Sequence, residues 1–63
     1  MKPQPGFCTC VDGDCVQFLH IQKEDGAHEV WRVRPIFQEA EDYDIKIRAG
    51  ETFRPLHSTT YRQ

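Results

Sequence analysis

Apolar and polar side chains alternate along much of this chain with a period of two residues. Trp31 and Val33 fall on one side of an extended segment, and Ile45 and Ile47 fall on one side of another, with charged residues between them. Alternation of this kind is typical of strands with one buried face. The pattern predicts five short strands, at residues 7–11, 15–22, 28–34, 44–48 and 52–55.

Two Asp-Gly pairs separate the first three predicted strands. Asp12-Gly13 and Asp25-Gly26 are dipeptides that accept the positive φ angles of tight hairpin turns. We therefore expect these strands to be antiparallel neighbours along the sheet.

The alternation breaks in the second predicted strand. Val16 and Phe18 fall on one face of residues 15–22, whereas Leu19 and Ile21 fall on the other. Such a strand is either buried on both faces or interrupted by a β-bulge, and both alternatives place it centrally in the sheet.

A helical period follows Pro35. The apolar residues Ile36, Phe37, Ala40 and Tyr43 are spaced so that they stack on one face of a short helix, and proline suits a first helical turn. One or two turns of helix are therefore predicted.

Together these elements predict a mainly β fold with one short helix, in the order three strands, one helix, two strands. The expected architecture is a small, strongly bent, five-stranded antiparallel sheet or partly open barrel, SH3-like or OB-like by analogy of shape. We expect one domain over residues 7–56, between flexible segments at residues 1–6 and 57–63.

Length and charge narrow the classes of function. A chain of 63 residues, 38% of them hydrophobic, has room for one small core. It lacks an apolar run of about 20 residues that would span a membrane, and residues 1–6 lack the apolar stretch of a secretory signal. We therefore expect a cytoplasmic protein without a membrane partner. The net charge of −2 gives the whole molecule no strong attraction for nucleic acid.

Three cysteines lie close together, at Cys8, Cys10 and Cys15. A two-residue turn between them would place Cys10 opposite Cys15 and all three sulfur atoms on one face of a hairpin. Reduced thiols are the first interpretation, because disulfide-stapled secreted chains usually have an even number of dispersed cysteines. A Cys10–Cys15 disulfide under oxidising conditions is the alternative.

A zinc site is a further interpretation of the same cysteines. Cys8, Cys10 and Cys15 would need a fourth ligand, for which the chain offers His20 or the more distant His28 and His57. Structural zinc sites favour two to four residues between paired cysteines, and Cys8 and Cys10 have one. No metal and no other cofactor is therefore favoured.

A set of basic residues falls opposite the predicted core positions of the later strands. The set consists of Arg32, Arg34, Lys46, Arg48 and Arg54. If their strands are neighbours, these cations form one surface that binds an acidic patch on a protein. The same surface would suit phosphates of RNA or DNA, although no aromatic residue interleaves with the cations. A solvated face, neutralised in part by the four carboxylates between residues 39 and 44, is the third interpretation.

The chain has no phosphate-binding glycine loop and no recognisable hydrolase motif, so we do not expect an enzyme. The sequence favours a small non-enzymatic protein-binding module, such as an adaptor, inhibitor or regulatory subunit. It would act through the cationic strand face and an unpaired edge strand, which docks a partner or pairs with a second copy of the chain. The alternatives are a nucleic-acid-binding barrel with the same basic face and a zinc-stabilised module with the cysteine cluster.

Overall fold

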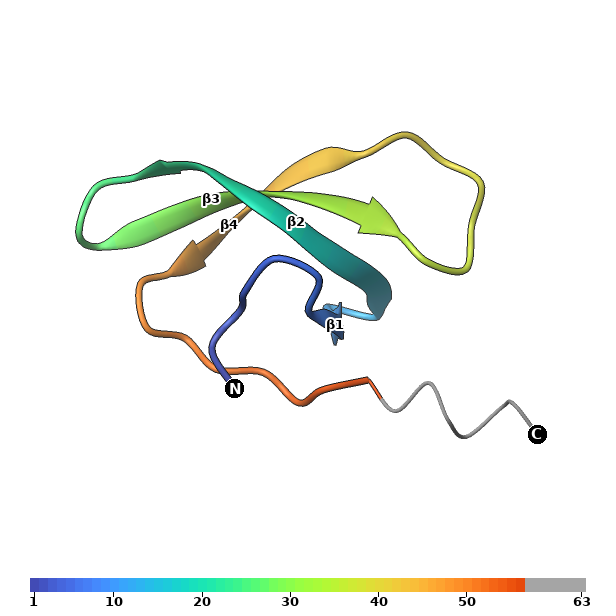
Figure 1. Ribbon diagram of the computed structural model, residues 1–63, viewed down its shortest axis with the longest axis horizontal. Helices are drawn as coiled ribbons and strands as arrows, with labels where there is room; N and C mark the ends of the chain where they lie inside the picture. Colours follow the sequence, from blue (N-terminus) through green and yellow to red (C-terminus); the bar gives the residue numbers. More distant parts are fainter. Residues whose placement is uncertain (57–63) are drawn as a thin grey trace.

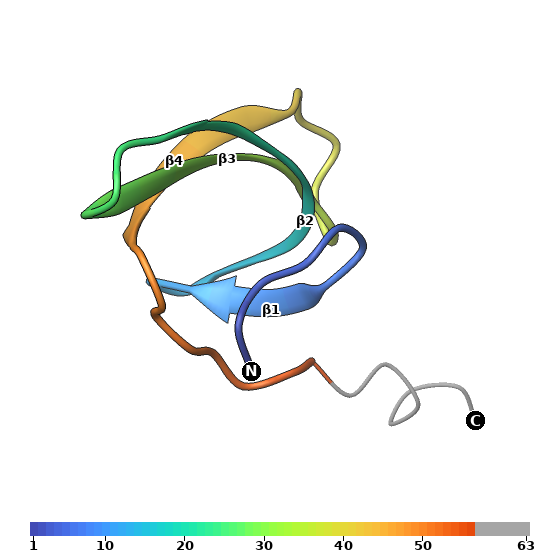
Figure 2. The same ribbon diagram turned by 60° about the vertical axis from the view of Figure 1, so that its left-hand side comes forward.

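The computed structural model describes residues 1–56, which form one curled antiparallel sheet (Figure 1). Its strands are β1 (Cys8–Val11), β2 (Asp14–Glu24), β3 (His28–Pro35) and β4 (Tyr43–Arg48). Each strand pairs with the next along the chain, so that the order in the sheet is β1-β2-β3-β4. Figure 2 shows the sheet curling from β4 and β3 through β2 to β1, which lies in a lower layer beside the orange C-terminal segment. The predicted mainly β fold with a bent antiparallel sheet is confirmed over these residues, as a half-barrel of four strands.

The first turn is the two-residue hairpin that the sequence predicts. Asp12 has a φ of 53° and Gly13 a φ of 88°, which are the left-handed conformations that such a turn requires. Val11 consequently pairs with Asp14, and Cys10 with Cys15.

The phase break in β2 is explained by bulges. The register of β2 against β3 shifts between Phe18 and His20, and again between Ile21 and Lys23. Each extra residue bends the strand and increases its twist. Because of this bending, β2 pairs with β1 in the lower layer at one end and with β3 in the upper layer at the other.

The core is centred on Phe18, which is fully buried. Its ring centroid lies 5.3 Å from that of Trp31 in an edge-to-face arrangement, 5.9 Å from that of Phe53 and 6.0 Å from that of Phe7. The predicted inward alternation of Trp31 and Val33 is confirmed, since both are buried. The buried apolar residues of the cluster are Val16, Phe18, Trp31, Val33 and Ile47.

The predicted short helix after Pro35 is wrong: residues 36–42 form an irregular connection, and no helix is present in residues 1–56. A helix over residues 36–43 would be about 12 Å long. Val33 and Tyr43, however, are directly paired between β3 and β4, so the chain after Pro35 must turn back and bring Tyr43 to within about 5 Å of Val33. Strand pairing therefore overrides the helical spacing of the apolar residues.

The predicted fifth strand at residues 52–55 is not formed as a strand, although the segment runs beside β1. The Leu56 amide donates to the Cys8 carbonyl at 2.8 Å, and the Thr9 hydroxyl donates to the Arg54 carbonyl at 2.6 Å. The amide and carbonyl of Phe53 bond to Met1 instead, so the segment divides its hydrogen bonds between two neighbours. The segment thus covers β1 without a continuous ladder.

Residues 1–6, expected to be a flexible segment, make backbone contacts to the rest of the sheet. Met1 and Phe53 exchange two hydrogen bonds of 2.8 Å, from the α-amino group of Met1 to the Phe53 carbonyl and from the Phe53 amide to the Met1 carbonyl. The Gly6 amide donates to the Phe18 carbonyl at 2.7 Å. The flexible tail expected at residues 57–63 lies outside the described residues.

Candidate docking edge and cationic face

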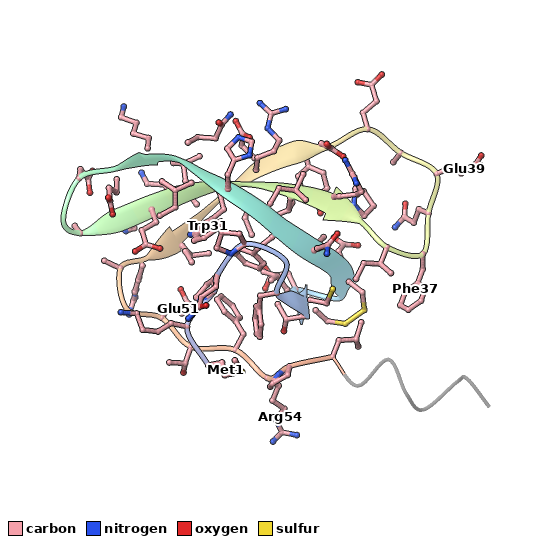
Figure 3. The ribbon with its side chains drawn as sticks, in the orientation of Figure 1. Met1, Trp31, Phe37, Glu39, Glu51 and Arg54 are labelled. Carbon is pink, nitrogen blue, oxygen red and sulfur yellow. A yellow bond between two sulfur atoms is a disulfide. The ribbon has the colours of Figure 1, made fainter. Side chains whose placement is uncertain are left out.

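The structure brings four of the five predicted basic site residues to the outer face of β3 and β4. Arg32 and Arg34 alternate with the buried Trp31 and Val33 on β3, and Lys46 and Arg48 alternate with Ile47 on β4. The fifth, Arg54, lies in residues 52–56 after β4, called the C-terminal segment below, and Figure 3 shows it pointing away from the sheet. The outer face of these two strands is called the cationic face below.

The two arginines on β3 are paired with carboxylates. Arg32 Nε lies 2.8 Å from Asp44 Oδ1, which belongs to the residue directly opposite on β4. Arg34 Nε lies 3.2 Å from Asp42 Oδ1, at the end of the irregular connection. Both pairs are partly exposed, so each contributes little to stability. They nevertheless reduce the positive charge that this end of the face presents to an anion.

The cations on β4 are not neutralised in this way. Within residues 1–56, neither Lys46 nor Arg48 has a carboxylate within ion-pair distance. Lys46 lies opposite Val30, which on its other side pairs with Lys23 of β2. A half-buried apolar side chain therefore lies between two lysines on the outer face.

A shallow hollow of about 100 Å³ lies beside these lysines and includes Asp25 and His28 in its lining. Asp25 Oδ1 accepts hydrogen bonds from the amides of His28 at 2.8 Å and Ala27 at 3.0 Å. These backbone hydrogen bonds, the one from His28 first, lower the pKa of the Asp25 carboxyl below its ordinary value. The carboxylate holds the β2–β3 turn and adds negative charge to the hollow, so the hollow is of mixed charge.

The cysteines of the first hairpin share its outer face, as the turn geometry predicts. Cys10 and Cys15 form a disulfide across β1 and β2, the alternative to the reduced thiols that the sequence favoured. Cys8 is the free cysteine, and its thiol lies 3.7 Å from the Gly6 carbonyl oxygen. The disulfide ties the hairpin together at a pair of strand positions opposite the buried face.

The four metal-ligand candidates do not form a metal site in the structure. Cys10 and Cys15 are bonded to each other, and the His20 ring hydrogen-bonds Gln22 Oε1 at 3.0 Å. Among residues 1–56, no three His, Cys, Asp or Glu side chains are grouped so that they could hold a metal ion. His57, the distant candidate, lies outside the described residues.

The two edges of the sheet differ in their exposure. At the β1 edge, the Leu56 amide donates a hydrogen bond to the Cys8 carbonyl, and the Thr9 hydroxyl donates one to the Arg54 carbonyl. The C-terminal segment therefore contacts this edge through one backbone and one side-chain hydrogen bond. At the other edge, β4 has a neighbour on one side only, because it is the last strand of the sheet.

The direction of the β4 backbone groups follows from one hydrogen bond. The Ala49 amide donates to the Ala27 carbonyl at 3.0 Å, in line with the register of the β3–β4 ladder. In an antiparallel pair, residues alternate between those whose amide and carbonyl face the partner strand and those whose groups face away. Because Ala49 faces β3, every second residue before it does the same. The amides and carbonyls of Ile45 and Ile47 therefore point toward β3. Those of Asp44, Lys46 and Arg48 point away from the sheet.

Arg48 supports this assignment independently. Its amide donates to Glu51 Oε1 at 3.0 Å, and its carbonyl accepts from the Glu51 amide at 3.0 Å. The turn after β4 thus closes one end of the outward row. Asp44 and Lys46 keep outward amides and carbonyls that have no hydrogen-bond partner among residues 1–56. These four backbone groups are called the docking edge below.

The sequence predicted an edge strand but did not identify it. With a fifth strand expected at residues 52–55, β4 had the pattern of an internal strand. The available signals are Pro55, because proline is disfavoured inside a strand, and the charged residues that alternate along β4. The carboxylate partners of Arg32 and Arg34 belong to the acidic run at residues 39–44, but they come from a strand and an irregular connection and not from a helix.

Comparisons with known proteins identify no relative: the chain matches no protein family, no curated protein and no solved structure. Over residues 1–56, no helix has the length and apolar character needed to cross a bilayer.

Proposed function

We propose that this protein is a small, non-enzymatic protein-binding module of the adaptor, inhibitor or regulatory-subunit type, and that the docking edge on β4 is its recognition element. The observation that supports this most directly is the outward direction of backbone groups on β4, the last strand of the sheet. The C-terminal segment contacts β1, whereas Asp44 and Lys46 keep their backbone groups directed outward. An extended peptide that adds to such an edge gains main-chain hydrogen bonds from each outward residue.

The side chains beside the edge set the chemistry of the partner. An added strand would place alternate residues next to Tyr43 and Ile45 on the inner side and next to Lys46 on the outer side. Tyr43 is 39% exposed and offers apolar area to a neighbour. No carboxylate of residues 1–56 lies within ion-pair distance of Lys46, so an acidic residue across from it gains an attraction. The favoured partner is an extended segment in which apolar residues alternate with charged ones, with an acidic residue opposite Lys46 and a basic residue opposite Asp44.

Backbone pairing alone supports only weak binding. The docking edge offers four groups, and each hydrogen bond contributes about 0.5–1.5 kcal/mol net of water. Association itself opposes binding by at least several kcal/mol. Specificity and most of the affinity must therefore come from the flanking side chains, which is typical of transient regulatory contacts.

Selection of seven-residue peptides displayed on phage, with the full chain immobilised, tests this proposal. We expect enriched peptides to alternate apolar and charged residues, with one acidic and one basic residue two positions apart. Binding should be lost with Lys46→Pro, because proline removes an outward amide without breaking a bond to β3. The matched control Lys46→Gln keeps the amide and removes the charge, so it should weaken binding and leave it measurable.

Circular dichroism of both variants checks that the sheet is intact. Failure to enrich any peptide, or equal binding of the selected peptides to wild-type protein and the folded Lys46→Pro variant, would show that the docking edge is not the recognition element.

A further inference from the structure

We propose that the partner at the docking edge is a second copy of this chain, paired antiparallel along β4 about a two-fold axis at Ile45. This inference rests on the proposed function, since it names the occupant of the same edge. It follows from the order of charges on β4 and from which backbone groups face outward.

The backbone restricts the possible registers. In an antiparallel pair of two β4 strands, outward residues must face outward residues for hydrogen bonds to form. Two-fold axes at Asp44, Ile45 or Lys46 meet this condition. An axis at Ile45 places Asp44 opposite Lys46 of the second copy, and the symmetry repeats this pair. All four groups of the docking edge on each chain then lie in hydrogen-bonded pairs.

Charge selects the axis at Ile45 among the three. An axis at Asp44 places two Asp44 carboxylates opposite each other, and an axis at Lys46 places two Lys46 ammonium groups opposite each other. Like charges directly opposite across strands are destabilising, whereas opposite charges are stabilising. The axis at Lys46 would also bring Asp44 opposite Arg48, whose amide and carbonyl are already bonded to Glu51.

Side chains on both faces fit the same register. On the inner side, Ile45 lies opposite Ile45 of the second copy, and Tyr43 lies opposite Ile47 of the second copy. A cross-strand pair of an aromatic and a β-branched residue is stabilising. On the outer side, Asp44 already lies 2.8 Å from Arg32. Lys46 of the second copy would add to this pair, and a network of charges contributes more than an isolated surface pair.

The small core limits the stability that one chain has on its own. Among residues 1–56 the cluster of buried apolar side chains has five members. A domain of this size buries a modest share of its surface, and oligomerisation is one way in which small domains gain stability. Pairing along β4 also satisfies the outward backbone groups of this edge, which could otherwise pair with the edge strands of other chains.

Analytical ultracentrifugation of the full chain over a range of concentrations tests the inference. We expect the weight-average mass to rise from 7.4 kDa toward twice that value with increasing concentration. Lys46→Asp should raise the dissociation constant about tenfold or more, because the new carboxylate would face Asp44 in both symmetric pairs. The charge-swapped variant Asp44→Lys with Lys46→Asp should return the dissociation constant to within about threefold of the wild-type value, since only the axis at Ile45 restores opposite charges.

A cysteine pair provides a second register test that does not depend on charge. In a Cys8→Ser background, Ile45→Cys should form a covalent dimer on mild oxidation, because position 45 meets itself at the axis at a spacing that a disulfide can bridge. The matched control Tyr43→Cys should not, because position 43 meets position 47 of the second copy.

The outcomes separate this inference from the proposed function. A wild-type chain that stays at 7.4 kDa at every concentration, while selected peptides still require the Lys46 amide, would overturn self-pairing and leave the docking edge in place. Self-association that is insensitive to both Lys46→Asp and Lys46→Pro would place the dimer contact elsewhere and overturn the inference. Peptide binding and self-association that both ignore Lys46→Pro would overturn both proposals.

Discussion

Replacing Phe18 with alanine removes the side chain around which the core is organised. Phe18 is fully buried and lies within 6.0 Å, centroid to centroid, of the rings of Phe7, Trp31 and Phe53. Deleting a buried phenylalanine side chain destabilises a protein by about 3–5 kcal/mol, through lost transfer free energy and the cavity that is left. The three ring contacts place this site at the upper part of that range.

The expected loss is large relative to the stability of so small a protein. At about 0.05–0.15 kcal/mol per residue, a chain of 63 residues has a free energy of unfolding of about 3–9 kcal/mol. Phe18→Ala should therefore lower the melting temperature by at least about 12 °C, or leave the chain unfolded at 25 °C.

Thermal and urea unfolding followed by far-ultraviolet circular dichroism measures this effect. The matched control is Phe37→Ala, which makes the same chemical change at a side chain that is 61% exposed. We expect the control to lose less than about 1 kcal/mol. A loss of less than about 1 kcal/mol for Phe18→Ala, or equal losses for the two variants, would refute the placement of the core around Phe18.

Two further predictions concern the closure of the half-barrel and the second turn. Thr9→Val keeps the buried shape and removes the hydroxyl that donates to the Arg54 carbonyl at 2.6 Å, so urea unfolding should show a loss of about 1–2 kcal/mol, against almost none for the exposed Thr52→Val. The lowered pKa of Asp25 means that its contribution to stability is present above the ordinary carboxyl pKa and is lost as the pH falls through the folded-state value. The difference in melting temperature between wild type and Asp25→Ala should therefore be largest at pH 7 and shrink by pH 2, and a difference that is constant with pH would contradict this role.

The local pattern predicts the strands well where one face is buried. Alternation assigns Trp31 and Val33 to the interior, and the Asp12-Gly13 turn sets the pairing of Cys10 with Cys15. These features follow from a period of two and from a turn that needs positive φ, which are both properties of neighbouring residues.

The errors arise where long-range pairing outweighs local preference. The apolar spacing after Pro35 is compatible with a helix, but the pairing of Val33 with Tyr43 requires a short irregular return. The segment around Phe53 has the alternation of a strand, yet its hydrogen bonds go to Met1 and to β1 separately. Local sequence contains neither of these distant contacts.

The sequence predicts which basic residues share a face of the sheet, but not their ion-pair partners or which strand lies at the edge. The alternation places Arg32, Arg34, Lys46 and Arg48 on one face, as the structure shows. The pairing of the first two with carboxylates depends on the register of β4 and on the path of residues 36–42, which the pattern did not give. The identity of the open edge depends on where the C-terminal segment lies.

Hydrogen exchange of individual β4 amides, followed by NMR, tests the central claim most directly. In dilute solution the Ile45 and Ile47 amides should be protected by β3, and the Asp44 and Lys46 amides should exchange rapidly. Raising the protein concentration, or adding a selected peptide, should slow exchange at Asp44 and Lys46 selectively. Protection of Lys46 equal to that of Ile45 in dilute solution, or exchange at Lys46 that neither addition slows, would contradict the assignment of β4 as the docking edge.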